Sequence, residues 1–532
     1  MKSVDNGIDD LPCTKYPILF HQFILQYALE KPNKVAIVWK EQEWTYNDLQ
    51  TFSQKYAEMF QSLNFITGDR VILELDPSPQ AVALIIACSI AGLVFVPVSP
   101  EIPFERLEKI IEITEPVALV SEKKVFHENK SLNYAQIQVL NDVIQISNAK
   151  PIVEKKPSTK LIDTDIAYII FTSGTTGTPK GIMMSHRAVL SFYRGMLKHC
   201  QMSPDSRVGS FSSLQFDFSL LDIGLALGSG QTLVLVPRVL FLKPRKFVDY
   251  LINKQITQMN ATPSVWKTIT RDSNAGLERL TNLRCVFYGG DFFPIQDIAK
   301  LKSLIPKLEK ITNAFGQSES IGCTFIDVQD LLGPDHTEVP IGRAHSEVDI
   351  ILVDDNEQLI TEANVYGEMY LRGTSLFSGY WKNTEQTDRV LVPNPIRPHT
   401  NELVFKTGDI ACIREDGNFY YKGRRDHQIK MNGNRVEIEE IELKLMTHPN
   451  INVAVIAKSE NNKEILAFIL PNTGEDEHIS EIELRKFCSV SLTKYMIPDR
   501  FIIVNEIPVT INSKIDRHKL KKYSLVGEER EL

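Results

Sequence analysis

The chain has 532 residues, of which 43% are hydrophobic and 24% charged, with 27 glycines and 27 prolines. This length exceeds what one hydrophobic core usually organises, and the composition excludes a disordered or low-complexity chain. Because 59 Lys and Arg face 67 Asp and Glu, the net charge is −8, which argues against broad electrostatic capture of nucleic acid or anionic membrane.

The N-terminal residues 1–10 carry acids where a secretory signal needs basic and then apolar residues. Seven scattered cysteines without a CxxC pair suit a reducing compartment and imply neither a disulfide framework nor a zinc site. We therefore expect a cytoplasmic protein.

The apolar run 81–98 approaches the length of a membrane span, but Gly92 and Pro97 interrupt it and acids flank it. The pattern favours a buried helix through Ala91, a glycine turn and a strand over 93–96. We therefore expect no membrane association.

Short β-branched runs at 35–38, 71–73, 117–120 and 232–236 alternate with amphipathic segments. Such alternation is typical of parallel sheets with helical crossovers and predicts an α/β class. After Gly423 the sequence becomes charged and then mixed. Helices are predicted at 437–445 and 480–488 and strands at 453–457, 465–469 and 500–504, which is an α+β pattern. We predict a large N-terminal domain over 1–424, rich in parallel sheets with helices, and a smaller α+β domain over 425–532.

The segment 168–181, YIIFTSGTTGTPKG, is an apolar strand that runs directly into a loop of hydroxyls and glycines ending near Lys180. Glycines let the backbone approach an oxyanion, hydroxyls donate hydrogen bonds and the lysine adds charge, so phosphate is the natural ligand. It is not the Walker P-loop, because Pro179 stands where that motif has glycine and Gly181 where it has Ser or Thr. The plainer alternative is a flexible surface loop.

This segment resembles the phosphate loop of the adenylate-forming superfamily, which includes acyl-CoA synthetases, luciferases and the adenylation domains of nonribosomal peptide synthetases. Two upstream segments, 44–49 and 91–98, resemble structural blocks of the same superfamily, and 367–373 with 379–381 resemble a later one. The matches occur in the family's order and span most of the chain.

The resemblance implies a nucleotide site. Asn313-Ala314-Phe315-Gly316-Gln317-Ser318-Glu319 matches the adenine and magnesium motif, with an aromatic ring for the base and Glu319 for Mg²⁺. Asp409 would accept the ribose hydroxyls and Arg424 would supply a nearby cation. The implied nucleotide-binding residues are Thr172, Ser173, Gly174, Thr175, Thr176, Gly177, Lys180, Asn313, Ala314, Phe315, Gly316, Asp409 and Arg424, with ATP and Mg²⁺ as the expected substrate and cofactor.

Near the C-terminus, 511–517 resembles the family's catalytic-lysine loop, although Ser513 replaces its usual glycine. By resemblance, Lys514 bridges the substrate carboxylate and the phosphate, while Thr172 and Glu319 complete the catalytic set. A solvated surface lysine is the alternative for Lys514.

The resemblance also implies a second step, in which the small domain acts as a mobile lid and rotates about a hinge at Asp426. Rotation would withdraw Lys514 and bring Met431-Asn432-Gly433-Asn434-Arg435 to the site. Gly433 suits the close approach of a pantetheine arm.

Asp217 matches the position where amino-acid-activating members keep a carboxylate for the substrate ammonium, although it could instead cap a helix that begins near Ser219. Aligned by the same motifs, the substrate pocket is predicted to contain Asp217, Phe218, Leu221, Asn260, Val286, Tyr288, Ala314, Gly322 and Cys323. Because this lining is mainly apolar, it favours a small or medium uncharged amino acid, with proline first and alanine or threonine behind it.

About fifteen residues follow Arg517, too few to fold as a carrier domain. We therefore expect a ligase that loads a free-standing carrier protein through its phosphopantetheine thiol, as in secondary-metabolite assembly. A D-alanine–carrier protein ligase, an acyl-CoA synthetase, a luciferase-like oxygenase and a non-catalytic nucleotide-binding regulator are the alternatives.

Overall fold

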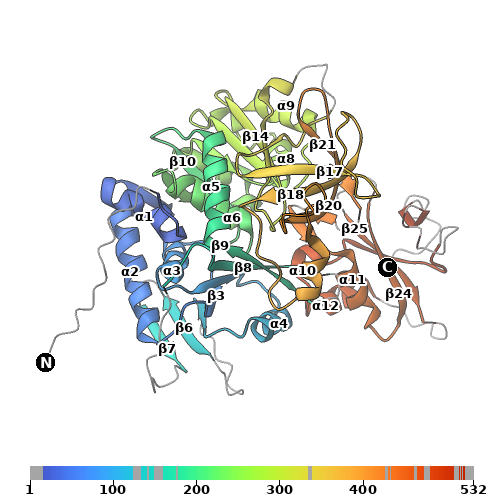
Figure 1. Cartoon of the computed structure of the whole chain (residues 1–532), viewed down its shortest axis with the longest axis horizontal. Coiled ribbons are helices and arrows are strands. Elements are labelled where there is room, and N and C mark those ends of the chain that lie inside the picture. Colours follow the sequence, from blue (N-terminus) through green and yellow to red (C-terminus); the bar gives the residue numbers. More distant parts are fainter. Residues whose placement is uncertain are drawn as a thin grey trace.

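The computed structural model describes residues 16–123, 134–140, 143–148, 160–174, 178–332, 338–425, 429–431, 433–459, 464–472, 480–508, 515, 517 and 519–521 (Figure 1). Within these ranges, no helix is both long and apolar enough to cross a membrane. The six cysteines they include carry free thiols.

The first sheet has seven strands in the order β7-β6-β5-β3-β4-β8-β9, parallel from β6 to β8 and antiparallel at both edges. The strands are β3 (Arg70–Glu74), β4 (Val94–Val98), β5 (Ala118–Ser121), β6 (Ala135–Leu140), β7 (Val143–Ser147), β8 (Ile166–Thr172) and β9 (Lys180–Ser185). Buried β-branched residues fill the central strands, as expected for a sheet covered on both faces.

The second sheet has nine strands in the order β16-β15-β14-β13-β12-β10-β11-β1-β2, with a parallel centre from β14 to β1. The strands are β1 (Val35–Trp39), β2 (Gln42–Thr45), β10 (Arg207–Ser210), β11 (Thr232–Leu235), β12 (Gln258–Asn260), β13 (Cys285–Gly289), β14 (Lys310–Phe315), β15 (Thr324–Asp327) and β16 (Arg343–Ala344). The carboxyl ends of its parallel strands meet at one edge, where ligand sites of α/β proteins form.

Helices separate and cover these two sheets. The largest core cluster joins both sheets through α1 (Phe20–Glu30), α2 (Tyr46–Ser62), α3 (Pro79–Ile90), α5 (His186–Cys200) and α6 (Asp217–Leu227). The outer face of the nine-stranded sheet packs on α7 (Pro244–Asn253), α8 (Pro263–Arg271) and α9 (Ile295–Leu304), and that of the seven-stranded sheet on α4 (Phe104–Thr114). The result is a layered α/β architecture.

A smaller antiparallel sheet follows in the chain, with β17 (Val348–Val353), β18 (Gly367–Gly373), β19 (Leu391–Pro393), β20 (Leu403–Ile413) and β21 (Phe419–Arg424), beside α10 (Thr384–Val390). The four 3₁₀ segments among the described residues are η1 (Arg238–Leu242), η2 (Leu277–Arg279), η3 (Gln329–Leu331) and η4 (Lys494–Met496).

The C-terminal part lies at one end of the molecule (Figure 1). A hairpin of β22 (Ile429–Met431) and β23 (Asn434–Val436) leads to α11 (Ile438–Met446), and a sheet of β24 (Ile451–Lys458), β25 (Ile465–Pro471) and β26 (Arg500–Ile503) packs on α11 and α12 (Glu481–Ser489). β21 ends at Arg424 and β22 begins at Ile429, so the boundary predicted after Arg424 falls between these two strands and stays a prediction.

The α/β class with a smaller C-terminal α+β part is confirmed. The strand expected at 35–38 is β1, and the two helices and three strands expected in the tail are α11, α12, β24, β25 and β26. The apolar run 81–98 forms α3 and β4, in which nearly every residue is buried within the protein core.

Candidate functional site

The predicted phosphate loop connects the hairpin strands β8 and β9, which place Thr172 opposite Lys180. Lys180 is buried. The buried Thr172 hydroxyl has no hydrogen-bond partner among the described residues, and it could therefore bond to a ligand. A Cβ on Gly174 would lie 2.1 Å from the Thr178 carbonyl oxygen, so only glycine fits there. The predicted loop residues Thr175, Thr176 and Gly177 lie outside the described residues.

The C-terminal part meets this loop directly. Lys180 Nζ lies 3.2 Å from Glu437 Oε1, and the Gly174 amide donates to Glu440 Oε2 at 3.1 Å. The Ser173 hydroxyl donates to the Arg435 carbonyl oxygen at 3.0 Å and accepts from the Glu437 amide at 3.1 Å. Segments more than 250 residues apart in the sequence therefore share one site.

Glu319, the predicted metal ligand, has no exposed surface. Arg435 Nη1 lies 2.8 Å from both of its carboxylate oxygens, and the Tyr380 hydroxyl donates to Oε1 at 2.7 Å. Burial alone would raise the pKa of Glu319, but Arg435, Lys180 and Tyr380 together lower it to about 2. Glu319 is thus an ionised carboxylate that forms an ion pair with Arg435.

The predicted ribose contact, Asp409, is 1% exposed at the site where β20 pairs with β21. Arg424 Nη1 lies 3.1 Å from Asp409 Oδ1, and Gln317 Nε2 donates to Oδ2. Asp409 and its predicted cation are therefore brought together, whereas Gln317 is a partner that the sequence analysis missed.

The motif residues of β14 adjoin this carboxylate. The centroid of the Phe315 ring lies 5.2 Å from that of the Tyr421 ring. Lys430 Nζ lies 5.0 Å from the centroid of the Phe315 ring and donates to the Gly316 carbonyl oxygen at 3.3 Å. Asn313 Nδ2 donates to the Pro340 carbonyl oxygen at 3.1 Å, and Ala314 is buried. Phe315 is partly buried beside the Tyr421 ring, and its role in stacking on the base stays a prediction.

Asp217 is the first residue of α6, where a carboxylate also complements the helix dipole. Burial raises its pKa, while the Ser318 side chain and the Phe218 amide hydrogen-bond to the ionised form and oppose the rise. Its nearness to Ser318 places the predicted ammonium partner next to the metal motif. The helix begins at Asp217 with Phe216 as N-cap, so the alternative role as a cap before Ser219 is not what the structure shows.

The predicted pocket residues divide between two faces of the nine-stranded sheet. Phe218, Leu221, Ala314 and Cys323 belong with the core against α6, and Asn260 Nδ2 donates to Asp222 of that helix. Gly322 adjoins this face, because a Cβ on it would lie 3.0 Å from the Phe192 ring.

Val286 and Tyr288 were predicted to line the same pocket, but they pack on the opposite face with Trp266 and α9. Side chains alternate along β13, so Phe287 occupies the pocket face instead, 6.2 Å from the Phe218 ring. The sequence alignment was therefore offset by one residue at this strand, and such an offset exchanges the faces.

Asp222 is a buried carboxylate that the sequence analysis missed. It has no exposed surface, and Ser210 Oγ and Asn260 Nδ2 donate to its oxygens at 2.6 and 2.8 Å. Burial raises its pKa to about 8, against the lowering by these two hydrogen bonds. The sequence offered one signal for this carboxylate, because Asp222 lies five residues after Asp217 and directly after the predicted pocket residue Leu221.

Gly433 is the residue expected to approach the site closely. It adopts φ of +83°, and its Cα lies 3.4 Å from where a Cβ on Gly290 would stand. A Cβ on Gly433 itself would lie 2.4 Å from Thr262 Cγ2. Gly433 and Arg435 therefore lie beside residues of the candidate site, whereas Met431 is buried in the core of the C-terminal part. Their part in the second step stays a prediction, and Asn432, the hinge residue Asp426 and Lys514 lie outside the described residues.

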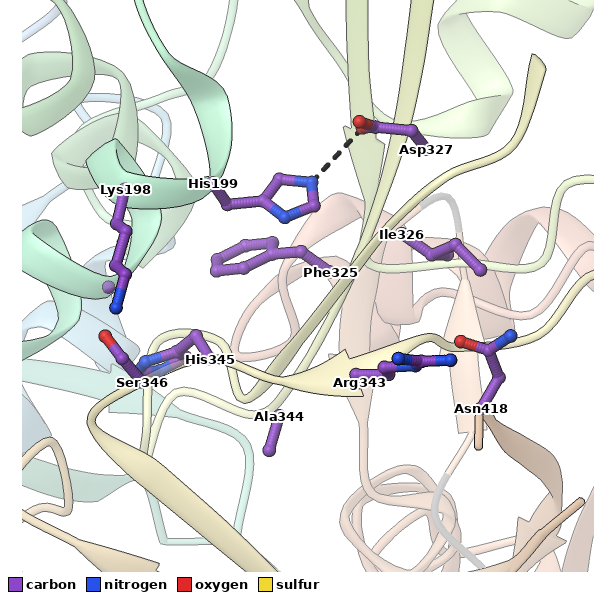
Figure 2. Close-up of a pocket in the computed structure, with 11 residues that line it drawn as sticks. Lys198, His199, Phe325, Ile326, Asp327, Arg343, Ala344, His345, Ser346 and Asn418 are labelled. Carbon is purple, nitrogen blue, oxygen red and sulfur yellow. Dashed lines mark hydrogen bonds and ion pairs between the residues drawn. The ribbon is translucent and has the colours of Figure 1, made fainter. Parts of the chain in front are cut away.

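A separate cavity of about 460 Å³ opens between the end of α5 and the strands β15 and β16 (Figure 2). His199 Nε2 pairs with Asp327 Oδ1 at 3.1 Å, Lys310 Nζ lies 3.0 Å from Asp327 Oδ2, and His345 contacts the Gly322 carbonyl oxygen. None of the predicted site residues lines this cavity. We therefore place the candidate site at the phosphate loop.

Comparisons with known proteins identify the family of this chain. Residues 25–381 match the model of the AMP-binding enzyme family, and residues 440–514 match that of the AMP-binding enzyme C-terminal domain. The chain is 31% identical over 512 residues to gramicidin S synthase 1 of Brevibacillus brevis, covering 95% of this chain but only 44% of that protein.

It is 29% identical to the L-proline–[L-prolyl-carrier protein] ligase of Pseudomonas fluorescens, covering 95% of this chain and 99% of that protein. The crystal structure of IdnL1 superposes with a TM-score of 0.84 and 36% identity, covering 93% of this chain and 99% of that one. The chain therefore belongs to the AMP-binding enzyme family, and the resemblance to adenylate-forming enzymes is confirmed.

Proposed function

We propose that this protein is an AMP-forming ligase that activates a small or medium uncharged α-amino acid, with L-proline first, and transfers it to the phosphopantetheine thiol of a separate carrier protein. The observation that carries the proposal is the placement of Asp217 beside the Ser318-Glu319 motif, which joins an ammonium partner to the nucleotide residues. The L-proline ligase of similar length supports the amino acid class.

In the first half-reaction, a carboxylate oxygen of the amino acid attacks the α-phosphorus of ATP, and pyrophosphate leaves with the electrons of the broken P–O bond. The incoming carboxylate and the phosphate oxygens all carry negative charge, so the site has to stabilise that charge. Lys180, the Gly174 amide and the Thr172 hydroxyl supply a cation and donors for the phosphates, and Lys514 is proposed to bridge the carboxylate and phosphate.

Asp409 binds the ribose hydroxyls in this proposal, and Arg424 keeps its carboxylate in place. Phe315 stacks on the base, with Asn313, Ala314 and Gly316 forming the surrounding strand. Asp217 pairs with the substrate ammonium, and because burial raises its pKa, the ion pair relieves an unfavourable buried charge.

Glu319 is the proposed Mg²⁺ ligand. The donor set fits, because Mg²⁺ in nucleotide sites is commonly held by one or two carboxylates together with substrate phosphates. Among the described residues, no group of three or more His, Cys, Asp or Glu side chains is arranged to hold a metal ion, and in this proposal the nucleotide supplies further oxygens. When bound, the ion neutralises phosphate charge; Glu319 positions it once Arg435 has moved away.

In the second half-reaction, the carrier thiolate attacks the carbonyl carbon of the aminoacyl adenylate, and AMP leaves. Gly433 itself adds no side chain where it faces Gly290, and in this proposal the pantetheine arm binds along this backbone. Asp426 is the proposed hinge between the two arrangements. The pocket residues proposed for specificity are Phe218, Leu221, Asn260, Ala314, Gly322, Cys323 and, replacing Val286 and Tyr288, Phe287.

Amino-acid-dependent pyrophosphate exchange across the common amino acids tests the proposal. We expect exchange with an uncharged substrate, highest with L-proline, and a large loss in Asp217→Asn. Asp222→Asn is the matched control, because it removes a second buried carboxylate one turn further along the same helix. If Asp222→Asn alone abolished exchange, the ammonium would pair with Asp222 and the assignment to Asp217 would be wrong.

Product formation separates the alternatives. A thioester with coenzyme A and a simple carboxylic acid, without amino acid exchange, would favour an acyl-CoA synthetase, and a strong preference for D-alanine would favour the D-alanine–carrier protein ligase. The absence of exchange with every acid tried would favour a nucleotide-binding regulator.

A further inference from the structure

One aromatic side chain, Phe325 of β15, lies between the proposed amino acid pocket and the cavity at the end of α5. Side chains alternate between the two faces of an extended segment, so Cys323, Phe325 and Asp327 share a face. Cys323 is a proposed pocket residue, whereas Asp327 lines the cavity. Phe325 stands between them in the chain and is 4% exposed.

On one side, Phe325 contacts the proposed pocket. It pairs with Ala314 across β14 and β15, so the two side chains lie next to each other on one face of the sheet. The centroid of its ring lies 6.0 Å from that of the Phe287 ring, which lies 6.2 Å from that of the Phe218 ring. Ala314, Phe287 and Phe218 are all proposed pocket residues, so the Phe325 ring forms the end of that pocket.

On its other side, Phe325 lines the cavity of about 460 Å³, where Figure 2 shows its ring alongside that of His199. The ring centroids of His199 and His345 lie 5.3 and 5.7 Å from that of Phe325. Lys198 and Arg343 also line the cavity, and both residues are exposed. The cavity therefore reaches the surface, with two cations where it opens.

The carboxylate that lines the cavity is already paired. Asp327 Oδ1 lies 3.1 Å from His199 Nε2, and Oδ2 lies 3.0 Å from Lys310 Nζ. Burial alone would raise the pKa of Asp327, but hydrogen bonds from His199, Thr312 and Lys310 lower it to about 2. Because these partners balance the negative charge, the opening of the cavity is positive and favours an anionic group.

We propose that Phe325 is a specificity-determining residue, whose ring limits the length of the substrate side chain by separating the amino acid pocket from the cavity. The inference rests on the proposed adenylation site. The cavity of about 460 Å³ falls within the ~300–1,000 Å³ of small-molecule pockets, so it has room for several more side-chain carbons. A longer side chain that ends in a carboxylate would also meet Lys198 and Arg343.

The experiment is pyrophosphate exchange by the full chain and by Phe325→Ala. The substrates are the best small amino acid, L-2-aminooctanoate with an uncharged tail, and L-2-aminosuberate with a carboxylate at the end of its tail. A single methylene in an apolar pocket changes kcat/KM by roughly 10–200-fold. We therefore expect the ratio of kcat/KM for 2-aminooctanoate to that for the small substrate to rise at least about tenfold in Phe325→Ala.

A second substitution tests whether the tail enters the cavity. Adding Lys198→Met to Phe325→Ala should reduce exchange with 2-aminosuberate roughly two- to fivefold, as expected for the loss of one exposed ion pair. Exchange with 2-aminooctanoate should not change, because its tail carries no charge. Equal effects on both long substrates would show that the tail does not reach this cation and would overturn the inference.

Two further variants separate specificity from stability. Truncating a buried aromatic residue destabilises a core, so Phe325→Leu provides a milder change that should shift the ratio in the same direction by a smaller factor. Phe247→Ala is the matched control, because Phe247 of α7 has no exposed surface and packs on the opposite face of the same sheet. It should lower the melting temperature and leave the ratio unchanged.

The outcomes distinguish this inference from the proposed function. An unchanged ratio in Phe325→Ala and Phe325→Leu, or an equal rise in Phe247→Ala, would overturn the inference and leave the proposed function standing. Preference of the wild-type chain for 2-aminooctanoate would do the same. Absence of exchange with every amino acid in the wild-type chain would overturn both.

Discussion

Replacing Gly433 by alanine is expected to slow thioester formation specifically. Gly433 has φ of +83°, a left-handed conformation that costs a residue with a side chain about 1–2 kcal/mol. The added Cβ would also stand 2.4 Å from Thr262 Cγ2, well inside the ~3.5–4.0 Å of a favourable carbon contact. Since 1.4 kcal/mol is a factor of ten, the backbone effect alone should reduce the population of this arrangement roughly five- to thirtyfold.

The assay compares single-turnover transfer from preformed aminoacyl adenylate with pyrophosphate exchange. Gly433→Ala should depress transfer by at least about tenfold and leave exchange within about twofold, because exchange uses the other domain arrangement. Adding Thr262→Ser removes the crowded methyl group and should restore part of the transfer rate, whereas the backbone penalty remains.

Gly68→Ala is the control for this comparison. Gly68 has φ of +89° but open space around it, so its substitution carries the backbone cost without a contact at the site. Equal loss of both half-reactions in Gly433→Ala, or normal transfer, would refute the assignment of this glycine to the second step.

Three further predictions concern the buried Asp222, the proposed hinge Asp426 and the proposed catalytic residue Lys514. Burial raises the pKa of Asp222 from its ordinary value of 3.8 to about 8. The stabilising contribution of this carboxyl group is therefore present below about pH 4 and is lost as the pH rises through about 8. Asp222→Asn should therefore melt at a higher temperature than wild type at pH 8 and show a flatter dependence of Tm on pH; a steeper dependence would contradict the burial argument. Asp426→Pro should retain pyrophosphate exchange and lose carrier loading, and equal loss of both activities would remove Asp426 as the hinge. Lys514→Ala should depress exchange far more than transfer from preformed adenylate, and an unaffected exchange rate would exclude Lys514 from adenylation.

Local sequence patterns predicted the elements and their order well. The β-branched runs at 35–38 and 71–73 became buried strands because both sheets are covered on both faces, and the loop before Lys180 followed from its glycines and hydroxyls. These features depend only on residues that are close together in the chain, so a single sequence is enough to predict them.

The errors and omissions arose where a contact depends on distant segments. Val286 and Tyr288 were assigned to the wrong face of β13, because a one-residue offset in an alignment exchanges the two faces of a strand. Asp222 was missed since its partners Ser210 and Asn260 come from two other strands. The meeting of Lys180 with Glu437 depends on how two domains are arranged, and local patterns contain no such information.

The hairpin of β8 and β9 has a consequence for how the phosphate loop tolerates change. Its last pair, Thr172 opposite Lys180, fixes where the loop leaves and re-enters the sheet. Substituting a hydroxyl inside the loop alters one donor and leaves the strands in place. Deleting one loop residue would shift the register of β9, turn Lys180 toward the opposite side of the sheet and disturb every pair along the hairpin. The spacing of this segment is therefore under a stricter constraint than the identity of its individual hydroxyl residues.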